Sequence, residues 1–287
     1  MEKTEKIWKT SQRKFDYGEK TLVMAILNVT PDSFSDGGKF FAIDEALRQA
    51  EKVISEGADI LDIGGESTRP NAARVETEEE IRRTSPVIEA IKKRFDIAIS
   101  IDTSKAKVAE SAVNSGAEII NDISGLRFDE RIAEVAAKYQ TGLVLMHLRG
   151  DFETMHEKQN SADIIAEVSD GFRLSIEKAR SFGVKNEAVA LDIGIGFSKT
   201  FEQNLQLLAR LKDICDEFSN FPMLVGVSRK SFIGKILNDA PTEERLNGTM
   251  AANSVAVWNG AKIIRVHDVK ANVEMLKTVE AIKRNFI

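Results

Sequence analysis

Short apolar runs recur eight times along the chain and predict its architecture. They begin near residues 21, 58, 96, 117, 142, 188, 222 and 261, and read TLVMAIL, ADILDI, DIAISI, AEIIN, GLVLM, AVALDI, PMLVGV and AKIIRV. Short apolar runs without sustained polar alternation are typical of strands that are buried on both faces. Strands of that kind belong to parallel sheets whose two faces are covered by helices.

Segments with a helical spacing of apolar residues lie between these runs. Residues 42–57 carry an apolar face and end at Gly57, a residue suited to the C-terminal cap of a helix. Residues 77–95 begin with Thr77 and Glu80 in the spacing of a capping box. Similar helical patterns cover residues 104–116, 129–139, 169–183, 201–218, 241–260 and 271–286.

The alternation of eight β and eight α segments predicts an α/β protein with a single (β/α)8 barrel, a TIM barrel. At about 36 residues per βα unit, the chain length is ordinary for that fold. The alternative is a doubly wound open sheet, but LNVTPDSFSDGG stands where that fold has a glycine-rich phosphate turn. We expect residues 1–20 to be an N-terminal extension and residues 21–287 to be the barrel domain.

Charge and composition exclude several classes of protein. A net charge of −5 argues against nucleic acid as a partner. Cys215 is the only cysteine, so neither a disulfide framework nor a cysteine metal cluster is expected. The first twenty residues lack the apolar core of a signal peptide, and no apolar run is long enough to span a membrane. We expect a soluble cytoplasmic protein with small-molecule partners.

Polar residues follow every one of the eight apolar runs. In a (β/α)8 barrel the carboxyl ends of the strands form the active face, so these residues would meet there. Eight converging polar ends predict a polar cavity. In chain order, the residues at the strand ends are Asn28; Glu66, Thr68 and Arg69; Asp102; Asn121 and Asp122; His147; Asp192; Ser228, Arg229 and Lys230; and Arg265, His267 and Asp268.

Two kinds of chemistry are mixed in this predicted cavity. Asp102, Asn121, Asp192 and Lys230 supply the acceptors and donors that recognise a flat heterocycle with adjacent N–H groups. Asp102 has an alternative role as the N-cap of the helix that follows it.

Arg265 and His267 are two residues apart in a strand-like run, so their side chains point the same way. With Asn28 and Arg69 nearby, they suit a phosphate or diphosphate group. The alternative for this run is a surface ion pair made with Asp268. His and carboxylate residues are too widely spaced to suggest a metal site built from protein ligands alone.

Seven segments of the chain resemble the signature segments of the dihydropteroate synthase family, in family order, between about residues 22 and 270. They are ILNVTPDSFSDGG, DIGGESTRP, SIDTSK, IINDISG, LDIGIGF, VSRKSFIG and IIRVHDV. The resemblance implies a (β/α)8 barrel that joins 6-hydroxymethyl-7,8-dihydropterin diphosphate to 4-aminobenzoate in folate biosynthesis, releasing diphosphate. It also implies a Mg²⁺ cofactor, a homodimer and a target of sulfonamides.

The resemblance assigns roles by position in this sequence. Asp36, Lys230 and Arg265 would act in catalysis, and Asn28 would contact Mg²⁺. The pterin would be bound by Asp102, Asn121, Asp192, Lys230 and Arg265. The diphosphate would be bound by Asn28, Thr68, Arg69, Arg265 and His267. The aminobenzoate would be bound by Phe34, Thr68, Pro70, Phe197 and Ser231, the last at a helix N-terminus where the dipole favours an anion.

The chain departs from the family pattern at a few positions. Ile193 replaces a usual proline, Ser198 a common glycine and Asn71 a frequent glycine, and HLRGDFETMH at 147–156 differs from the usual segment. Two loops, at 28–40 and 64–75, are rich in small and polar residues and are expected to close over substrate. A methyltetrahydrofolate-dependent methyltransferase, or a pterin-binding barrel without catalysis, is the alternative function.

Overall fold

The computed structural model describes residues 6–29, 38–68 and 72–285, and at its centre is a closed barrel of parallel strands. Each of the eight strands is parallel to both of its neighbours. The barrel prediction is therefore confirmed, and the doubly wound open sheet is excluded. Around the barrel, the strands are β10 (Ile263–Val266), β3 (Leu22–Asn28), β4 (Ile60–Gly64), β5 (Ala98–Asp102), β6 (Ile119–Asp122), β7 (Gly142–Met146), β8 (Val189–Asp192) and β9 (Met223–Val225).

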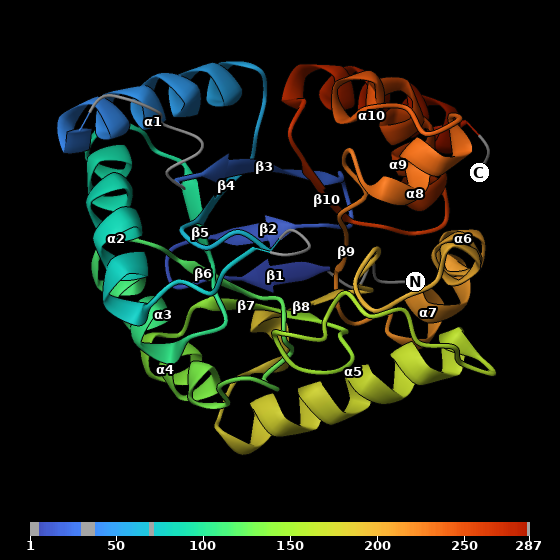
Figure 1. The fold of residues 1–287 in the computed structure, drawn as a ribbon, viewed down its shortest axis with the longest axis horizontal. Coiled ribbons are helices and arrows are strands. Elements are labelled where there is room, and N and C mark those ends of the chain that lie inside the picture. The colour runs from blue at the N-terminus through green and yellow to red at the C-terminus, as the bar shows by residue number, and fades with distance from the viewer. Residues whose placement is uncertain (1–5, 30–37, 69–71, 286–287) are drawn as a thin grey trace.

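Helices surround the barrel on its outside, as Figure 1 shows. The long ones form where helical patterns predict them, but the pattern at 201–218 is broken into two helices at Arg210. The α-helices are α1 (Gly38–Ser55), α2 (Thr77–Arg94), α3 (Ala106–Asn114), α4 (Arg131–Tyr139), α5 (Ile164–Ser181), α6 (Phe201–Ala209), α7 (Leu211–Glu217), α8 (Ser231–Ile236), α9 (Leu246–Trp258) and α10 (Val269–Arg284). Short 3₁₀ turns occur at η2 (Asn186–Ala188) and η3 (Thr242–Glu244).

Of two predicted helix ends, one is confirmed and the other is wrong. Gly57 follows α1 with a φ of +104°, which confirms it as the residue that ends this helix. The capping box predicted at Thr77 and Glu80 is wrong, because Glu76 occupies the N-cap position and makes no side-chain cap. Glu80 is instead fully buried and accepts a hydrogen bond from Lys105 Nζ at 2.6 Å. A buried charge with a cationic partner nearby gains more from that partner than from an exposed cap.

The side chains inside the barrel form layers. The lowest layer is apolar and takes one residue from each strand, namely Met24, Ile60, Ala98, Ile119, Val144, Ala190, Leu224 and Ile263. Because side chains alternate between the two faces of a strand, residues two positions further on also point inward. That next layer consists of Ile26, Asp62, Ser100, Asn121, Met146, Asp192, Gly226 and Arg265. The barrel interior thus changes from mostly apolar to mostly polar between two successive layers of side chains.

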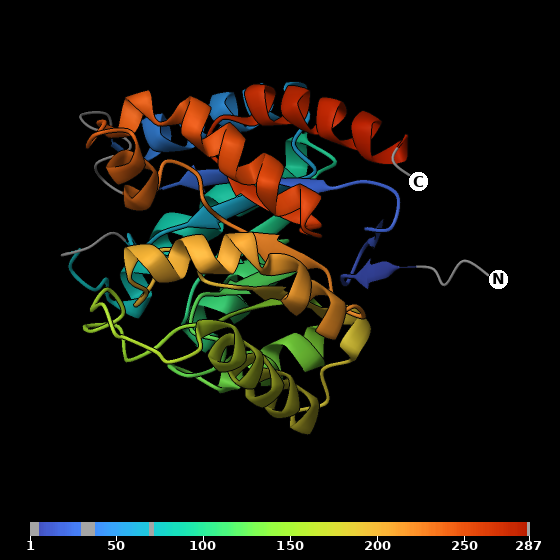
Figure 2. The ribbon, with the colours of Figure 1, turned by 90° about the vertical axis from the view of Figure 1, so that its right-hand side faces the viewer.

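An antiparallel hairpin, β1 (Ile7–Lys9) and β2 (Lys14–Asp16), packs under the apolar layer. Trp8 is completely buried there, and its indole Nε1 donates a hydrogen bond to the carbonyl of Ala188 at 2.9 Å. Figure 2 shows the hairpin at one end of the barrel and the long β7–α5 segment, residues 147–163, at the other. Part of the predicted N-terminal extension therefore covers the apolar end of the barrel.

None of the helices in the described ranges is long and apolar enough to cross a membrane.

Candidate functional site

A cation lies between two carboxylates in the polar part of the barrel. Arg265 on β10 donates from Nε to Asp62 Oδ2 on β4 and from Nη2 to Asp102 Oδ2 on β5, both at 2.6 Å. Burial alone would lower the pKa of Arg265, but the two carboxylates outweigh it and its pKa is raised. One cation cannot compensate two buried anions, so burial raises the pKa of Asp102 to about 7 in spite of Arg265.

Sequence reasoning missed Asp62, although the signal was present. A charged residue inside an apolar strand, two positions after the inward-facing Ile60, must point into the barrel. The alternative role for Asp102 as a helix cap is wrong, because Lys105 occupies the N-cap position of α3 and Asp102 pairs with Arg265.

Asn121 and a neighbouring hydroxyl extend this acceptor-rich wall. Asn121 Nδ2 donates to Asp62 Oδ2 at 3.1 Å, so one oxygen of Asp62 serves both Asn121 and Arg265. Asp62 Oδ1 and Ser100 Oγ are buried and have no hydrogen-bond partner in the described part of the chain. Buried polar atoms without partners are costly, so this wall is suited to a ligand that brings its own N–H donors.

Asp192 and Lys230 form the opposite wall. Asp192 Oδ1 accepts a hydrogen bond from the Gly194 amide at 2.8 Å, and burial raises the pKa of this carboxyl. Lys230 donates from Nζ to the carbonyl of Ile195, and its Nζ lies 4.5 Å from the centre of the Phe197 ring. Burial lowers the pKa of Lys230 to about 8, with Asp192 opposing the shift, so the ammonium remains charged at neutral pH.

The β8–α6 loop, residues 193–200, is tightly bent. Gly194, Gly196 and Ser198 all have positive φ, at +65°, +84° and +49°. A side chain at Gly194 would bring Cβ within 2.1 Å of the His147 carbonyl oxygen, so only glycine fits. Ser198 departs from the family glycine yet keeps the left-handed backbone. Ile193, the departure from proline, is completely buried in the core.

Lys199 is buried beneath this loop, and among the described residues no carboxylate is in hydrogen-bond contact with it. Its Nζ donates to the carbonyls of Gly194, Phe197 and His147 at 2.9, 3.2 and 3.3 Å. Burial lowers its pKa to about 7, because carbonyl dipoles replace only part of the hydration that the ammonium loses. The lysine therefore connects the β8–α6 loop to the end of β7.

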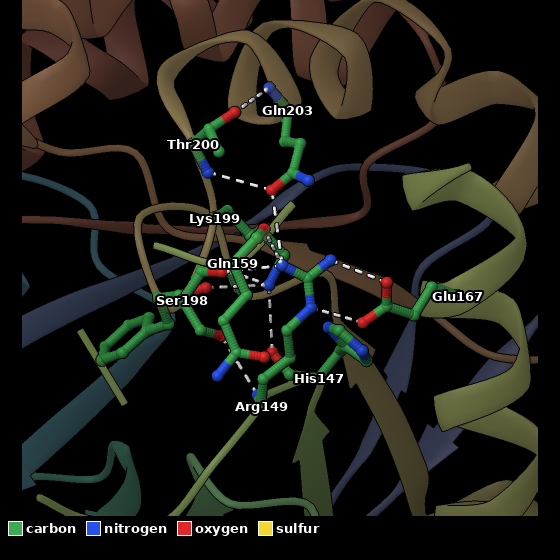
Figure 3. Close-up of polar contacts among 10 residues, drawn as sticks. His147, Arg149, Gln159, Glu167, Ser198, Lys199, Thr200 and Gln203 are labelled. Carbon is green, nitrogen blue, oxygen red and sulfur yellow. Dashed lines mark hydrogen bonds and ion pairs between the residues drawn. The ribbon is translucent and has the colours of Figure 1, made fainter. Parts of the chain in front are cut away.

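Arg149 joins the same loop to the β7–α5 segment, as Figure 3 shows. Its Nη1 donates to the carbonyls of Ser198 at 2.8 Å and Gln159 at 2.6 Å, and its Nη2 donates to Glu167 on α5 at 2.7 Å. The amide of Arg149 donates to Ser198 Oγ at 3.1 Å, which offsets the strain of a non-glycine residue there. The next turn is held by a capping box between Thr200 and Gln203.

His156 connects both loops that border the barrel mouth. Its ring stacks on Phe197 with the ring centres 5.5 Å apart and an angle of 26° between the planes. Its Nε2 lies 2.8 Å from the carbonyl oxygen of Thr68, so it donates there in the matching tautomer. Nothing in the sequence pattern singled out His156, because its partners lie far away in the chain.

The base of the β4–α2 loop, residues 65–76, is held by a buried lysine of its own. Lys105 Nζ donates to Glu66 Oε1 at 2.8 Å, to the carbonyl of Val75 at 2.7 Å and to Glu80 Oε2 at 2.6 Å. Both ends of the loop that carries Thr68 are therefore attached to the start of α3, where Lys105 is the N-cap residue, and through Glu80 to α2. A hollow of about 530 Å³ lies just outside this base, lined by Arg74, Lys107, Asp129, Arg131 and other residues, with none of the barrel-interior residues named above among them.

The remaining predicted residues lie at the ends of β3, β9 and β10. His267 Nδ1 is 3.0 Å from Ser228 Oγ, and Ser231 is the exposed first residue of α8. Asn28 ends β3 near Gly64: a Cβ built on Gly64 would lie 3.6 Å from Asn28 Oδ1.

One sequence-based alternative is resolved by the ion pairs at this rim. Asp268 pairs with Arg229, with Nε–Oδ2 at 2.9 Å, and not with Arg265.

Five further predicted positions, Phe34, Asp36, Arg69, Pro70 and Asn71, lie outside the described residues. Across the described ranges, no group of three or more His, Cys, Asp or Glu side chains could hold a metal ion.

Comparison with known proteins places this architecture among pterin enzymes. The family model described as "Pterin binding enzyme" matches residues 24–267. A dihydropteroate synthase of Synechocystis sp. is 47% identical over 273 residues, which cover 95% of this chain and 94% of the relative.

Solved structures agree with the sequence match. The dihydropteroate synthase of Xanthomonas albilineans, determined with 4-aminobenzoic acid, superimposes with a TM-score of 0.90 at 38% identity, covering 98% of this chain and 99% of that one. That of Yersinia pestis, in a sulfonamide drug complex, gives 0.89 at 42% identity, covering 97% and 99%.

Proposed function

The chain belongs to the dihydropteroate synthase family, and from that premise we propose that its barrel interior binds the pterin and its rim binds 4-aminobenzoate. Its activity is that of a dihydropteroate synthase in folate biosynthesis. The enzyme condenses 6-hydroxymethyl-7,8-dihydropterin diphosphate with 4-aminobenzoate to give 7,8-dihydropteroate and diphosphate.

The observation that carries the pterin assignment is the acceptor-rich wall above an apolar floor. Asp102, Asn121 and Asp192 present acceptors inside the barrel, and Asp62 adds a buried oxygen without a donor. A pterin has adjacent ring and amino N–H groups along one edge, which match such acceptors, while Lys230 supplies a donor for its carbonyl and ring nitrogen side. The flat guanidinium of Arg265 would stack on the ring.

The diphosphate would lie above the pterin, towards the loops. Arg265 lies on β10, His267 directly follows that strand, and Asn28 ends the neighbouring strand β3. With Thr68 and Arg69 they would bind and neutralise the leaving group.

Mg²⁺ remains a proposed cofactor, with Asn28 as its protein contact. A single amide oxygen suits Mg²⁺ only together with substrate oxygens and water, which is how this ion is usually bound. When bound, it supplies charge neutralisation to the departing diphosphate.

The chemistry then needs no strong protein acid. The bond between the exocyclic methylene and the diphosphate oxygen breaks, and its electron pair leaves with the diphosphate. The electron-rich dihydropterin stabilises the methylene cation, with Asp36 as a further stabilising charge. The aniline nitrogen of 4-aminobenzoate attacks this carbon, forms the C–N bond and loses a proton. Loops closed over the site would exclude water, which competes for the cation.

The aminobenzoate site would be framed by Phe34, Thr68, Pro70, Phe197 and Ser231. Phe197 already packs against Lys230, and Ser231 stands at the start of α8, where backbone N–H groups favour a carboxylate. Since sulfonamides resemble 4-aminobenzoate in shape and charge, they would compete at this position.

A homodimer is part of the proposal as well. Ile236 and Leu237 at the end of α8 and Val255 and Trp258 of α9 are large apolar side chains with substantial exposure. Large exposed apolar side chains suit a contact with a second copy of the chain. The cytoplasmic location stays a prediction.

The test is diphosphate release by the purified protein, with pterin diphosphate, Mg²⁺ and 4-aminobenzoate each omitted in turn. We expect release to require all three and to yield dihydropteroate. Tight pterin binding in calorimetry without release would contradict the proposal and favour a methyltransferase or a non-catalytic barrel.

A further inference from the structure

We propose that His156 is a wall of the 4-aminobenzoate site and positions Phe197 and the backbone of Thr68 for the acceptor substrate. This inference rests on the proposed function, because it uses the assignment of Phe197 and Thr68 to that site. His156 lies in the segment 147–156, whose sequence departs from the family pattern.

The side chain of His156 contacts residues of two different loops. The His156 ring stacks on Phe197, and its Nε2 hydrogen-bonds the backbone of Thr68, a residue 88 positions earlier in the chain. The same Phe197 ring has the Lys230 ammonium 4.5 Å from its centre. Any movement of His156 would move the aromatic ring against which the aminobenzoate ring is expected to pack.

The segment behind His156 is firmly packed. Phe152 and Met155 are buried in a cluster with Ile123, Met146 and Leu148, and Phe197 packs against that cluster. The beginning of the segment is attached through Arg149 to Ser198 and Glu167, as seen in Figure 3. His156 is therefore a fixed part of the rim and is anchored on two sides.

The surroundings of the His156 ring favour its neutral form. Half-burial lowers the pKa of His156; the Thr68 carbonyl opposes this shift, and the nearby Lys230 adds to it. A neutral imidazole can donate one hydrogen bond to Thr68 while its face packs on Phe197. A neutral, flat wall suits the apolar ring of 4-aminobenzoate and leaves its carboxylate to the positive end of the site.

The experiment compares His156→Leu and His156→Phe in steady-state kinetics and pterin calorimetry. Leucine removes both contacts, so we expect the KM for 4-aminobenzoate to rise about tenfold while the Kd for the pterin diphosphate stays unchanged. Phenylalanine keeps the stacking and loses only the Thr68 bond, so it should restore most of this loss. Glu157→Gln, an exposed neighbour, is the matched control and should leave both constants at wild-type values.

A Phe197→Ala variant, measured in parallel, distinguishes the role of His156 from the assignment of the aminobenzoate site. If Phe197→Ala raises the aminobenzoate KM and His156→Leu does not, the role of His156 is refuted and the site assignment stands. If Phe197→Ala leaves the KM unchanged, the proposed site itself is refuted. A pterin Kd that weakens with His156→Leu would also overturn the inference, because the effect would then not be specific to the acceptor site.

Discussion

The barrel interior and the rim above it hold their charged groups in different ways. Inside, the cation of Arg265 is compensated by the side chains of Asp62 and Asp102, all carried by strands. At the rim, Lys199 donates only to backbone carbonyls, and Arg149 donates to two loop carbonyls as well as to Glu167.

The difference shows what each region is built to do. Strand register places Asp62, Asp102 and Arg265, so their geometry follows directly from the sheet. Rim cations instead give backbone carbonyls of the loops hydrogen-bond partners, so they decide the shape of segments that have no regular structure. The interior would then define what binds first, and the rim would define how the second substrate is held.

The largest effect is expected from removing an interior group. Asp192→Ala and Lys230→Ala should each weaken binding of the pterin diphosphate by about ten- to a hundredfold, since hydrogen bonds to charged groups contribute about 1.5–3 kcal/mol. Calorimetry measures this directly. Cys215→Ala, far from the polar layer, should keep wild-type affinity, and unchanged affinity in both pocket variants would refute the interior assignment.

The next largest effect is expected at the rim. Arg149→Met should lower the free energy of unfolding by about 2–3 kcal/mol, because Glu167 loses its partner and the Ser198 and Gln159 carbonyls lose their donor. It should also raise the KM for 4-aminobenzoate more than the pterin Kd. Urea unfolding and kinetics check the two parts, and Arg173→Met, on the exposed face of α5, is the control. A pterin Kd that rises as much as the aminobenzoate KM would show that interior and rim are not separable.

Lys199, a rim cation that donates to backbone carbonyls, should make the free energy of unfolding depend on pH. Its folded pKa of about 7 lies below the ordinary lysine value of 10.5, so between these values the unfolded chain binds a proton that the folded chain does not. The free energy of unfolding should therefore rise with pH in that window, by up to about 1.4 kcal/mol per pH unit from this group.

Lys199→Met should remove this contribution, and unfolding in urea at several pH values between 7 and 10 measures the change in slope. Lys107→Met, at an exposed lysine, should keep the wild-type slope. Equal slopes for Lys199→Met and wild type would mean that Lys199 is charged in the folded protein.

The smallest effect is expected at Ser198, where strain and a hydrogen bond nearly cancel. Ser198→Gly relieves a positive φ but loses the bond from the Arg149 amide, so the stability should stay within about 1 kcal/mol of wild type. Ser198→Ala loses the bond and keeps the strain, so it should be less stable by about 1 kcal/mol. Thermal unfolding distinguishes them, and an alanine variant as stable as wild type would show that the hydrogen bond adds nothing.

The sequence by itself determined the barrel and most of the interior set. Eight apolar runs that alternate with helical patterns predict a parallel sheet covered by helices. Because side chains alternate along each strand, Asp102, Asn121, Asp192 and Arg265 all point into the same end of the barrel. Even Asp62, which was missed, follows from the same alternation. These features depend on local periodicity, so residues that are close together in the sequence are enough to predict them.

Only the tertiary structure decided the rim. The contacts of Arg149 with Ser198, of Lys199 with His147 and of His156 with Thr68 join segments between 49 and 88 residues apart. No periodic pattern in the sequence connects such residues. The geometry of the loops depends on which distant side chains reach the backbone carbonyls of those loops. The capping prediction at Thr77 was wrong for the same reason: a buried lysine from another strand end competes for Glu80, and no local pattern reveals that competitor.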